Sequence, residues 1–340
     1  MNFGGLLLRR IRSGDMNALI IGAGGIAHHH LNSLRSLGVE VLGIYDVDGE
    51  RAAKLAAEYG TAAVTDVDRA LEGADTVFLL TPPSTRLSYM KRICGKCKAV
   101  FAEKPLAVTV EDAKEMERLA EENGMLCMVG FTQRFRRGFA LLKEKLDDGT
   151  LGEVVQTLSV RIGPGPGSNG KLEESWRTDR RFVCGMSIES LSHDLDFHQA
   201  LGGRIRKIKG QVKGTVSQLP QFDNNSDAVL QFESGAIGCI ACSWRRAIAY
   251  TMKGVIGTKG AAFLRGDDIW DNTELIIQTF GKKEERIPLE DIFQEGEGYL
   301  NEDRYFFECV AKGENPEVNL TTGRRILELS HRILETSKED

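Results

Sequence analysis

A glycine-rich turn near the start of the chain constrains the fold most strongly. Residues 19–21 form a short apolar run typical of a buried strand, and residues 22–27, with the spacing G-x-G-x-x-A, precede a helical stretch. At this spacing Gly22 permits a tight turn, Gly24 lets the backbone approach a pyrophosphate, and Ala27 lets helix and strand pack closely. The first N–H groups of such a helix are free to bind phosphate. The expected phosphate-binding residues are Gly22, Gly24, Gly25, Ile26 and Ala27.

A second strand pattern, over residues 39–45, ends in Asp46. An acid at about this distance from the glycine turn accepts hydrogen bonds from the hydroxyls of an adenosine ribose. Its carboxylate would repel a 2′-phosphate, so the sequence favours NAD over NADP. An alternative is that Asp46 caps the helix that starts near Asp48, and both roles are compatible.

The following elements alternate between helix and strand up to residue 130. Alternation of this kind predicts a doubly wound parallel sheet. The pattern gives helices over 50–59 and 110–123, strands over 76–80 and 125–129, and a strand that ends at Lys104, with the rigid turn Thr81-Pro82-Pro83-Ser84 between them. We therefore expect a nucleotide-binding domain over residues 16–130. Residues 1–15 show no periodicity, and we expect a disordered leader there, with Met16 as the natural start.

Lys104 stands in the run Glu103-Lys104-Pro105, directly after an apolar strand. Pro105 disfavours helix at the residue before it and so holds Lys104 in extended geometry at the carboxyl end of the strand. Ligands of open α/β sheets bind at that end. The alternative is that Glu103 and Lys104 are a solvated pair ahead of a helix.

From residue 131 onward the sequence pattern changes, and it predicts a second domain over 131–340. Short turns link a series of strand patterns, which indicates a large, mostly antiparallel sheet. The strands are expected over 153–162, 205–217, 227–233, 236–244, 250–256 and 261–264, with two closing helices over 297–311 and 322–335. The Gly- and Pro-rich residues 163–170 are expected to form a loop. The overall fold class is α/β, with two domains.

One helical run of the second part, residues 186–201, carries Glu189 and His193 four positions apart. Residues at i and i+4 share a helix face, and a carboxylate beside a histidine orients the ring for acid-base chemistry. The alternative is an ordinary surface pair of a glutamate and a histidine.

The composition of the 340 residues excludes several classes of protein. Their formal net charge of -5 gives no electrostatic case for binding nucleic acid or an anionic membrane. Seven cysteines, an odd number, indicate free thiols in a reducing compartment, which favours a cytoplasmic location.

Three cysteine and histidine patterns resemble metal motifs, but we expect no metal site. The consecutive residues His28, His29 and His30 point in different directions on a helix and cannot all bind one ion. Cys239 and Cys242 lie in an alternating strand pattern, where residues three apart face opposite sides of a sheet. We read these cysteines, and the pair Cys94 and Cys97, as packing thiols.

Taken together, these motifs resemble the Gfo/Idh/MocA family, over about residues 18–337. The marks of the resemblance are residues 22–27 with His30, Thr81-Pro82-Pro83-Ser84, Glu103-Lys104-Pro105, Gly130-Phe131 with Arg134-Phe135, the helix with His193 and Asp196, and Gly257-Thr258-Lys259-Gly260. The resemblance implies a Rossmann domain followed by an α/β domain whose open sheet often forms homodimers or homotetramers.

The resemblance also implies roles for individual residues. Lys104 matches the family's catalytic lysine, and Glu189 with His193 matches its Asp-x3-His pair, with a glutamate where aspartate is usual. Where the family often has a histidine after the Thr-Pro-Pro turn, this chain has Arg86, which would add a cation near the cofactor. The implied cofactor contacts are Thr81, Pro82, Pro83, Arg86, Glu103, Lys104, Trp176 and Arg177, and the implied substrate contacts are Lys104, Arg134, Glu189 and His193.

The reaction that the resemblance implies is hydride transfer between a nicotinamide and a secondary alcohol of a sugar, a cyclitol or a derivative. Arg134, Arg177, Arg180 and Arg181 are candidates to bind an acidic group on such a substrate, or are simply solvated. Two alternatives stay open. One is a lyase or glycosidase that uses NAD for transient oxidation, and the other is a non-catalytic protein that senses a nucleotide.

Overall fold

The computed structural model describes residues 16–166, 185–216, 219, 222–245, 248–268, 271–289 and 296–339. The chain divides into two compact units. The first comprises the described residues of Gly4–Phe135 and Glu295–Leu327, and the second those of Arg136–Gln294 and Glu328–Asp340. The sequence predicts that all residues after 130 form the second domain. The observed division differs, because Glu295–Leu327 belongs to the first unit. The leader expected at residues 1–15 lies outside the described residues.

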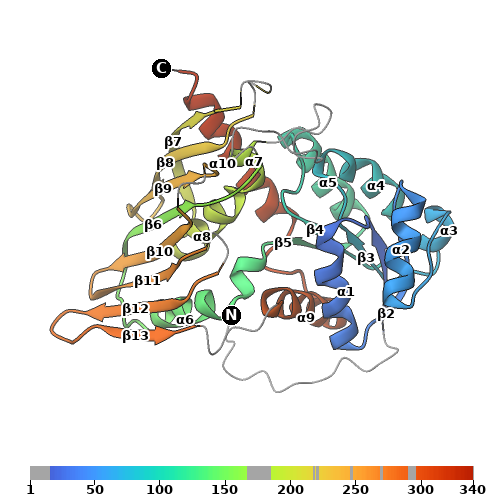
Figure 1. The fold of residues 1–340 in the computed structure, drawn as a ribbon, viewed down its shortest axis with the longest axis horizontal. Coiled ribbons are helices and arrows are strands. Elements are labelled where there is room, and N and C mark those ends of the chain that lie inside the picture. The colour runs from blue at the N-terminus through green and yellow to red at the C-terminus, as the bar shows by residue number, and fades with distance from the viewer. Residues whose placement is uncertain are drawn as a thin grey trace. The chain divides into compact units, whose positions relative to one another are not determined.

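The first unit is built on a parallel sheet, as the sequence predicts (Figure 1). Within the described residues it has five strands in the order β2-β1-β3-β4-β5. They are β1 (Asn17–Ile21), β2 (Glu40–Tyr45), β3 (Thr76–Leu79), β4 (Ala99–Glu103) and β5 (Leu126–Gly130). The order reverses between β1 and β3, and in sheets of this kind the ligand binds outside the carboxyl ends at that point.

Helices cover both faces of this sheet. They are α1 (Gly25–Leu37), α2 (Gly49–Tyr59), α3 (Val67–Leu71), α4 (Arg86–Ile93) and α5 (Val110–Glu122). The connection from β1 to β2 crosses the sheet in the opposite direction to those from β3 to β4 and β5. Because such crossovers are right-handed, α1 lies on the face opposite α4 and α5.

The returning C-terminal segment completes the core of the first unit. Helix α9 (Glu297–Lys312) packs against α1, and its buried residues Phe306 and Phe307 contact the strand residue Phe78. Farther on, the carbonyl of Val318 accepts a hydrogen bond of 2.8 Å from the N–H of Val129 in β5. The sequence places both helices of this region correctly, but not the unit to which α9 belongs. The last helix, α10 (Leu320–Thr336), contributes to both units.

The second unit contains a large, mostly antiparallel sheet, again as predicted. Its described strands follow the order β13-β12-β11-β10-β6-β9-β8-β7, and among them β6 and β9 form the one parallel pair. They are β6 (Val154–Ile162), β7 (Ile205–Lys213), β8 (Asn225–Phe232), β9 (Ile237–Ser243), β10 (Tyr250–Gly257), β11 (Gly260–Gly266), β12 (Glu274–Thr279) and β13 (Glu285–Pro288). The sequence pattern predicts neither β12 nor β13, and the strand that it predicts for β7 runs past the observed end at Lys213.

Helices cover one face of this sheet. Helix α6 (Arg137–Asp147) packs on β11 and β12, and α8 (Ser192–Gly202) packs on β6. Their apolar side chains form a buried core with the strands. Its members include Phe139, Leu142, Leu151, Phe197, Leu201, Leu264 and Leu275.

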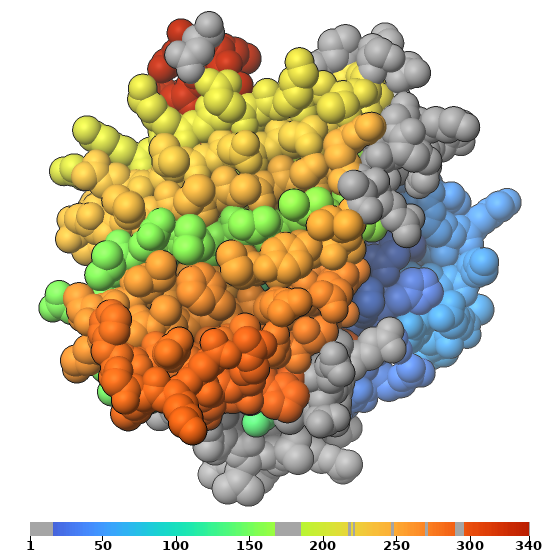
Figure 2. Space-filling view, turned by 60° about the vertical axis from the view of Figure 1, so that its left-hand side comes forward, coloured from blue at the N-terminus to red at the C-terminus, as the bar shows by residue number. Residues whose placement is uncertain are grey.

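The other face of the sheet carries a row of apolar side chains across neighbouring strands. Figure 2 shows this face, with β7 and β8 in yellow, β6 in green and β11 to β13 in orange. Cross-strand pairs connect Val229 to Cys239, Cys239 to Leu158, and Phe263 to Ile276. These side chains are half-buried, apart from Val229, which is exposed.

Among the described helices, none combines the length and the apolar run that crossing a membrane requires.

Candidate active site

The glycine turn follows β1 in the geometry that its sequence predicts. Gly22 has a φ of +110°, and a Cβ at this position would lie 2.9 Å from the carbonyl carbon of Leu80, at the end of β3. Both the backbone angle and the close approach therefore require glycine. The N–H of Gly22 donates to the carbonyl of Tyr45 over 2.8 Å, which joins the turn to β2.

The next two glycines leave room for a ligand. A Cβ built on Gly24 or Gly25 would meet no described atom within 4 Å. Helix α1 begins at Gly25 with no hydrogen bond from a capping side chain and no acidic residue in its first turn, among the residues described. Open backbone N–H groups at a helix amino terminus suit a pyrophosphate. The local geometry therefore fits a dinucleotide.

Asp46 holds the glycine turn and does not cap the following helix. Its Oδ2 accepts from the N–H of Ala23 over 2.7 Å, and its Oδ1 accepts from the N–H of Asp48 over 2.9 Å. The cap of α2 is instead Asp48, which accepts from the N–H of Arg51 over 3.1 Å. Of the two roles considered for Asp46, capping is excluded, and the ribose role stays a prediction.

The Thr-Pro-Pro turn and Arg86 join the carboxyl ends of β3 and β4. The described turn runs from Thr81 and Pro82 into a short 3-10 helix, Pro83–Thr85, ahead of α4. The buried guanidinium of Arg86 donates to the carbonyl of Thr81 over 2.9 and 2.7 Å, and also to the carbonyls of Glu103 and Pro105. The charge expected near the cofactor is thus present at the strand ends, but it is engaged by backbone carbonyls.

Lys104 directly follows β4 at its carboxyl end, as the sequence predicts. The preceding Glu103 is buried, and its Oε2 accepts from the backbone N–H of Lys104 over 2.9 Å. Glu103 is therefore not half of a solvated pair. Because this buried carboxylate holds the backbone N–H of Lys104, it fixes the point from which the Lys104 side chain extends.

Arg134 lies in the 3-10 helix Thr132–Phe135 and is buried. Its guanidinium forms an ion pair of 3.6 Å with the largely exposed Glu317. Arginine forms such pairs with carboxylates readily. A role in binding an acidic substrate group would therefore have to compete with this carboxylate.

The segment that carries Glu189 and His193 differs from the single helix expected over 186–201. It forms a short helix, α7 (Met186–Glu189), and then α8, with Ser190 and Leu191 between them. The N–H of His193 consequently donates to Ser190, and the N–H of Leu191 donates to Met186. The prediction that Glu189 and His193 share one face of an uninterrupted helix is therefore wrong.

Arg161 of β6 explains the interruption. Its guanidinium donates to the carbonyl and the hydroxyl of Ser190 over 3.0 and 2.9 Å, and to Asp194 over 2.7 Å. Asp194 also pairs with the buried Lys253 over 3.0 Å. Burial alone would raise the pKa of Asp194, but Arg161 and Lys253 outweigh it and hold that pKa below its ordinary value.

Other buried polar contacts fix this segment from both ends. At its start, Asp223 accepts from the N–H of Ser187 over 2.9 Å, and Gly185 lies so close to Asp223 that no side chain fits there. Farther along, His198 contacts the hydroxyls of Thr157 and Ser159 in β6. Burial lowers the pKa of His198 to about 3, so its ring is neutral. The sequence analysis gave no role to Asp223 or His198, since only their partners in other strands and loops reveal it.

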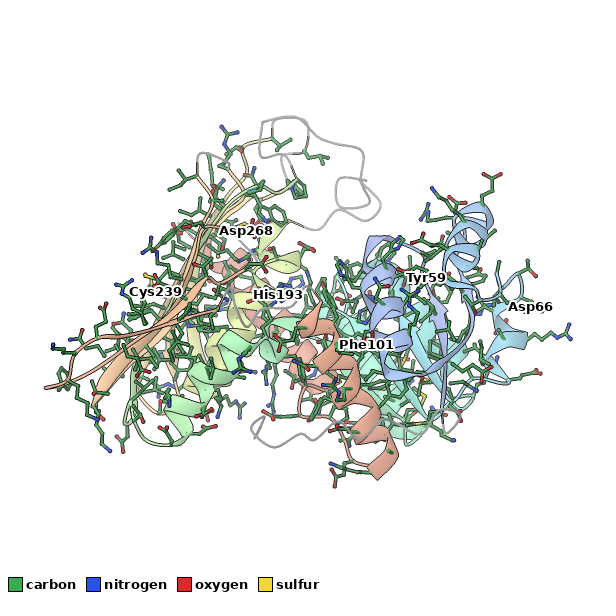
Figure 3. All side chains as sticks on the ribbon, turned by 60° about the horizontal axis from the view of Figure 1, so that its bottom comes forward. Tyr59, Asp66, Phe101, His193, Cys239 and Asp268 are labelled. Atoms are coloured by element: carbon green, nitrogen blue, oxygen red, sulfur yellow. The ribbon has the colours of Figure 1, made fainter. Side chains whose placement is uncertain are left out.

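Both residues of the candidate catalytic pair are buried on this segment. Glu189 is 4% exposed and His193 is 6% exposed, which excludes an ordinary surface pair. Figure 3 labels His193 on α8 and Cys239 on the sheet. Lys104 belongs to the first unit and His193 to the second, so their shared site stays a prediction. Trp176, Arg177, Arg180 and Arg181 lie outside the described residues.

The histidines and cysteines pack with separate partners. His28 contacts Tyr59 over 3.2 Å, whereas His30 contacts Asp303 over 2.9 Å. All cysteines in the described part of the chain are free thiols, and Cys239 and Cys242 alternate in burial along β9. Within that part, no group of three or more candidate ligand side chains is arranged to hold a metal ion.

Comparison with known protein families agrees with this geometry. Residues 16–131 match the model of an oxidoreductase family with an NAD-binding Rossmann fold, and residues 139–263 match the GFO/IDH/MocA C-terminal domain. Together the two matches cover most of the chain. It belongs to the Gfo/Idh/MocA family. The chain is thus an oxidoreductase with an NAD-binding domain, and the open glycine turn is where its residues fit the dinucleotide.

Members of the Gfo/Idh/MocA family resemble this chain over almost its whole length. The scyllo-inositol 2-dehydrogenase (NAD(+)) of Bacillus subtilis is 27% identical over 317 residues, which is 89% of each chain. The myo-inositol 2-dehydrogenase of Thermotoga maritima is 26% identical, over 94% of this chain and 96% of its own. A levoglucosan dehydrogenase, solved with NADH and levoglucosan, has the same fold, with a TM-score of 0.86 at 18% identity over 95% of this chain and 97% of its own.

Proposed function

We propose that this protein is an NAD-dependent dehydrogenase that oxidises a secondary alcohol of a cyclitol or a sugar. The observation that carries the proposal is the match in sequence, over almost the full length, to two inositol dehydrogenases. The cofactor preference rests on Asp46, whose carboxylate stands beside the glycine turn and disfavours a 2′-phosphate.

The proposed chemistry assigns one task to each catalytic side chain. NAD, when bound, supplies the acceptor for the hydride that leaves the alcohol carbon. His193 takes the hydroxyl proton as general base, and Glu189 orients the imidazole or binds a neighbouring hydroxyl. Lys104 donates a hydrogen bond to the same substrate oxygen and stabilises the negative charge that develops on it. Because Lys104 and His193 belong to different units, their action on one oxygen is part of the proposal.

The proposal includes a homo-oligomer, either a dimer or a tetramer, formed through the sheet of the second unit. Its support is the apolar row that runs through Val229, Cys239, Leu158, Phe263 and Ile276, since exposed apolar patches commonly mark interfaces. A self-complementary interface forms between two copies of one chain, so the expected partner is a second copy of this protein. We expect that Val229→Lys together with Phe263→Lys shifts the light-scattering mass to that of one chain, whereas Lys114→Glu, an exposed change on α5 of the first unit, leaves it unchanged.

A cytoplasmic location belongs to the same proposal. Its support is that the described cysteines are free thiols, which is the usual state of cysteine in a reducing compartment.

The test of the activity is nicotinamide absorbance on mixing the protein with NAD or NADP and a panel of myo-inositol, scyllo-inositol, glucose and levoglucosan. We expect reduction of NAD with at least one polyol, and its loss in Lys104→Ala. The matched control is Lys98→Ala, because Lys98 precedes β4 and is exposed, whereas Lys104 follows the same strand.

The other outcomes separate the alternatives. If no polyol reduces NAD and the nucleotide is found still bound after denaturation, a lyase or glycosidase that oxidises its substrate transiently replaces the dehydrogenase. If NAD binds and exchanges freely without any turnover, a nucleotide sensor replaces both enzymes. If neither NAD nor NADP binds, all three functions fail.

A further inference from the structure

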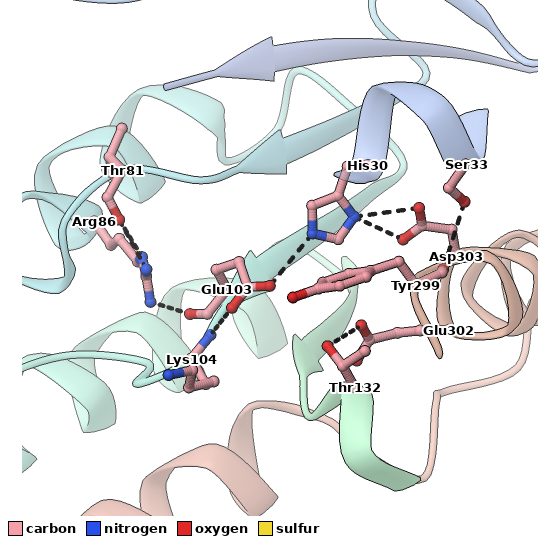
Figure 4. A network of polar contacts seen from close by, with 10 residues as sticks. All are labelled: His30, Ser33, Thr81, Arg86, Glu103, Lys104, Thr132, Tyr299, Glu302 and Asp303. Carbon is pink, nitrogen blue, oxygen red and sulfur yellow. Dashed lines mark hydrogen bonds and ion pairs between the residues drawn. The ribbon is translucent and has the colours of Figure 1, made fainter. Parts of the chain in front are cut away.

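His30 is completely buried between two carboxylates in the first unit (Figure 4). Its Nδ1 lies 2.9 Å from Oδ1 of Asp303, on α9, and its Nε2 lies 3.3 Å from Oε1 of Glu103, at the end of β4. The rings of Phe101 and Tyr299 pack edge-on against the imidazole. The histidine therefore connects three elements that are far apart in the sequence.

The carboxylates determine the charge of this histidine. Burial alone lowers the pKa of His30, but Asp303 and Glu103 outweigh it and raise that pKa to about 10. At neutral pH both ring nitrogens then carry hydrogens, and each donates to one carboxylate. A buried imidazolium with two charged acceptors is held in a single orientation, because each of these bonds is charge-assisted.

The neighbouring Glu302 does not compete for His30. It is also fully buried, and its Oε2 accepts from the hydroxyl of Thr132 over 2.8 Å. Burial and the nearby Glu103 raise the pKa of Glu302 well above its ordinary value. The carboxylates that contact the His30 ring are therefore those of Glu103 and Asp303.

Glu103 transmits this arrangement to Lys104. One carboxylate oxygen contacts His30, and the other accepts from the backbone N–H of Lys104 over 2.9 Å. The carbonyl of Glu103 accepts from Arg86 at the same time. Glu103 is thus held at its side chain and at its backbone, and the chain leaves β4 in a fixed direction.

We propose that His30 and Asp303 are positioning residues for Lys104 that act through Glu103, although neither is exposed to a substrate. The inference rests on the catalytic role proposed for Lys104. Removal of the imidazolium releases the Glu103 carboxylate from its partner in the core. The amide of Lys104 then loses its fixed acceptor, and the ammonium group moves relative to the substrate oxygen.

The first experiment needs no substrate. Reductive methylation with isotope-labelled formaldehyde gives each lysine an NMR signal, and Lys104→Arg and Lys98→Arg identify two of them. We expect His30→Gln and Asp303→Asn to move the Lys104 signal, because the labelled amine changes its surroundings. The Lys98 signal, from the other end of β4, stays in place. Asp303→Glu keeps the charge and restores the parental signal.

Matched controls separate positioning from general damage. His28→Gln changes a half-exposed histidine on the same helix, and Glu308→Gln changes an acid elsewhere on α9. Both are expected to leave the Lys104 signal unchanged. An unchanged Lys104 signal in both folded variants, His30→Gln and Asp303→Asn, overturns the inference.

Kinetics with NAD and each polyol of the panel provide the second readout. We expect His30→Gln and Asp303→Asn to lower kcat roughly tenfold to a hundredfold, because small displacements of a catalytic group are costly, with KM for NAD little changed. Equal losses in kcat and in NAD affinity would indicate a disrupted domain and contradict positioning. If the parent oxidises no polyol, the proposed function fails, and the lysine signals alone decide this inference.

Discussion

Arg161 donates to Asp194 through both Nε and Nη2, over 3.0 and 2.7 Å, and so joins strand β6 to helix α8 at the residue after the candidate catalytic histidine. Both side chains are buried, and the same guanidinium also holds Ser190. The helix that carries His193 is therefore fixed to the sheet by an ion pair as well as by apolar packing.

Loss of this pair is expected to be costly. Arg161→Met leaves Asp194 buried with Lys253 as its remaining charged partner, and we expect the free energy of unfolding to fall by about 3–5 kcal/mol. Chemical denaturation measures the change. The control is Arg265→Met in the same sheet, because Arg265 is exposed and its ion pair with Glu274 contributes about 1 kcal/mol or less. Equal losses in the two variants would contradict a special role for Arg161.

The buried imidazolium predicts a pH dependence of stability. His30 has a pKa of about 10 in the folded chain, above its ordinary value of 6.5, so folding favours its protonated form. Its contribution is fully present below pH 6.5 and declines as the pH rises through 10. We expect parent and His30→Gln to differ most in unfolding free energy at low pH and to converge at high pH. A difference that grows with pH would overturn the assigned charge.

The glycine turn predicts that two similar substitutions have different effects. Gly22→Ala introduces a Cβ against Leu80 at a positive φ and should destabilise the chain by about 1–3 kcal/mol. Gly24→Ala has space around its Cβ and should preserve the melting temperature, yet it should weaken NAD binding, because the methyl group occupies the approach to the pyrophosphate. Calorimetry and NAD titration measure the two effects. Tight NAD binding by Gly24→Ala would argue against this site.

Asp46 and Asp48 should separate cofactor choice from helix capping. Asp46→Ser removes the charge that disfavours a 2′-phosphate, and we expect the ratio of kcat/KM for NAD to that for NADP to fall about tenfold. Asp48→Ala removes the cap of α2 and should cost about 1 kcal/mol of stability without altering that ratio. If the ratio changes in Asp48→Ala and not in Asp46→Ser, the assignment of cofactor selectivity to Asp46 is wrong.

The sequence predicts those features whose causes are local. The turn at Gly22, the strand before Lys104 and the alternating strands of the second sheet each follow from spacing within a few residues. The break at Ser190 is different, since it depends on Arg161, which lies 29 positions earlier in the chain. No pattern within residues 186–201 signals it. The sequence therefore names Glu189 and His193 as candidates, but it does not predict their backbone geometry.

Distant partners also explain what was missed in the first unit. His30 was noted as part of a motif, but its partner Asp303 is separated from it by 273 positions. The grouping of Glu295–Leu327 with the first unit has the same origin, because α9 looks like any amphipathic helix until it packs on α1. Arg86 is expected near a cofactor from its place after the Thr-Pro-Pro turn, and only the positions of three carbonyls show how its charge is used.

The return of α9 to the first unit has a consequence for biosynthesis. The ribosome releases residues 16–135 long before Asp303, so His30 and Glu103 emerge without the carboxylate that completes their cluster. The nucleotide-binding unit thus cannot reach its final core until nearly the whole chain has been translated. Domains usually fold in the order in which they are made. Here the part encoded first waits for residues near the end of the chain, just as the second unit waits for Glu328–Asp340.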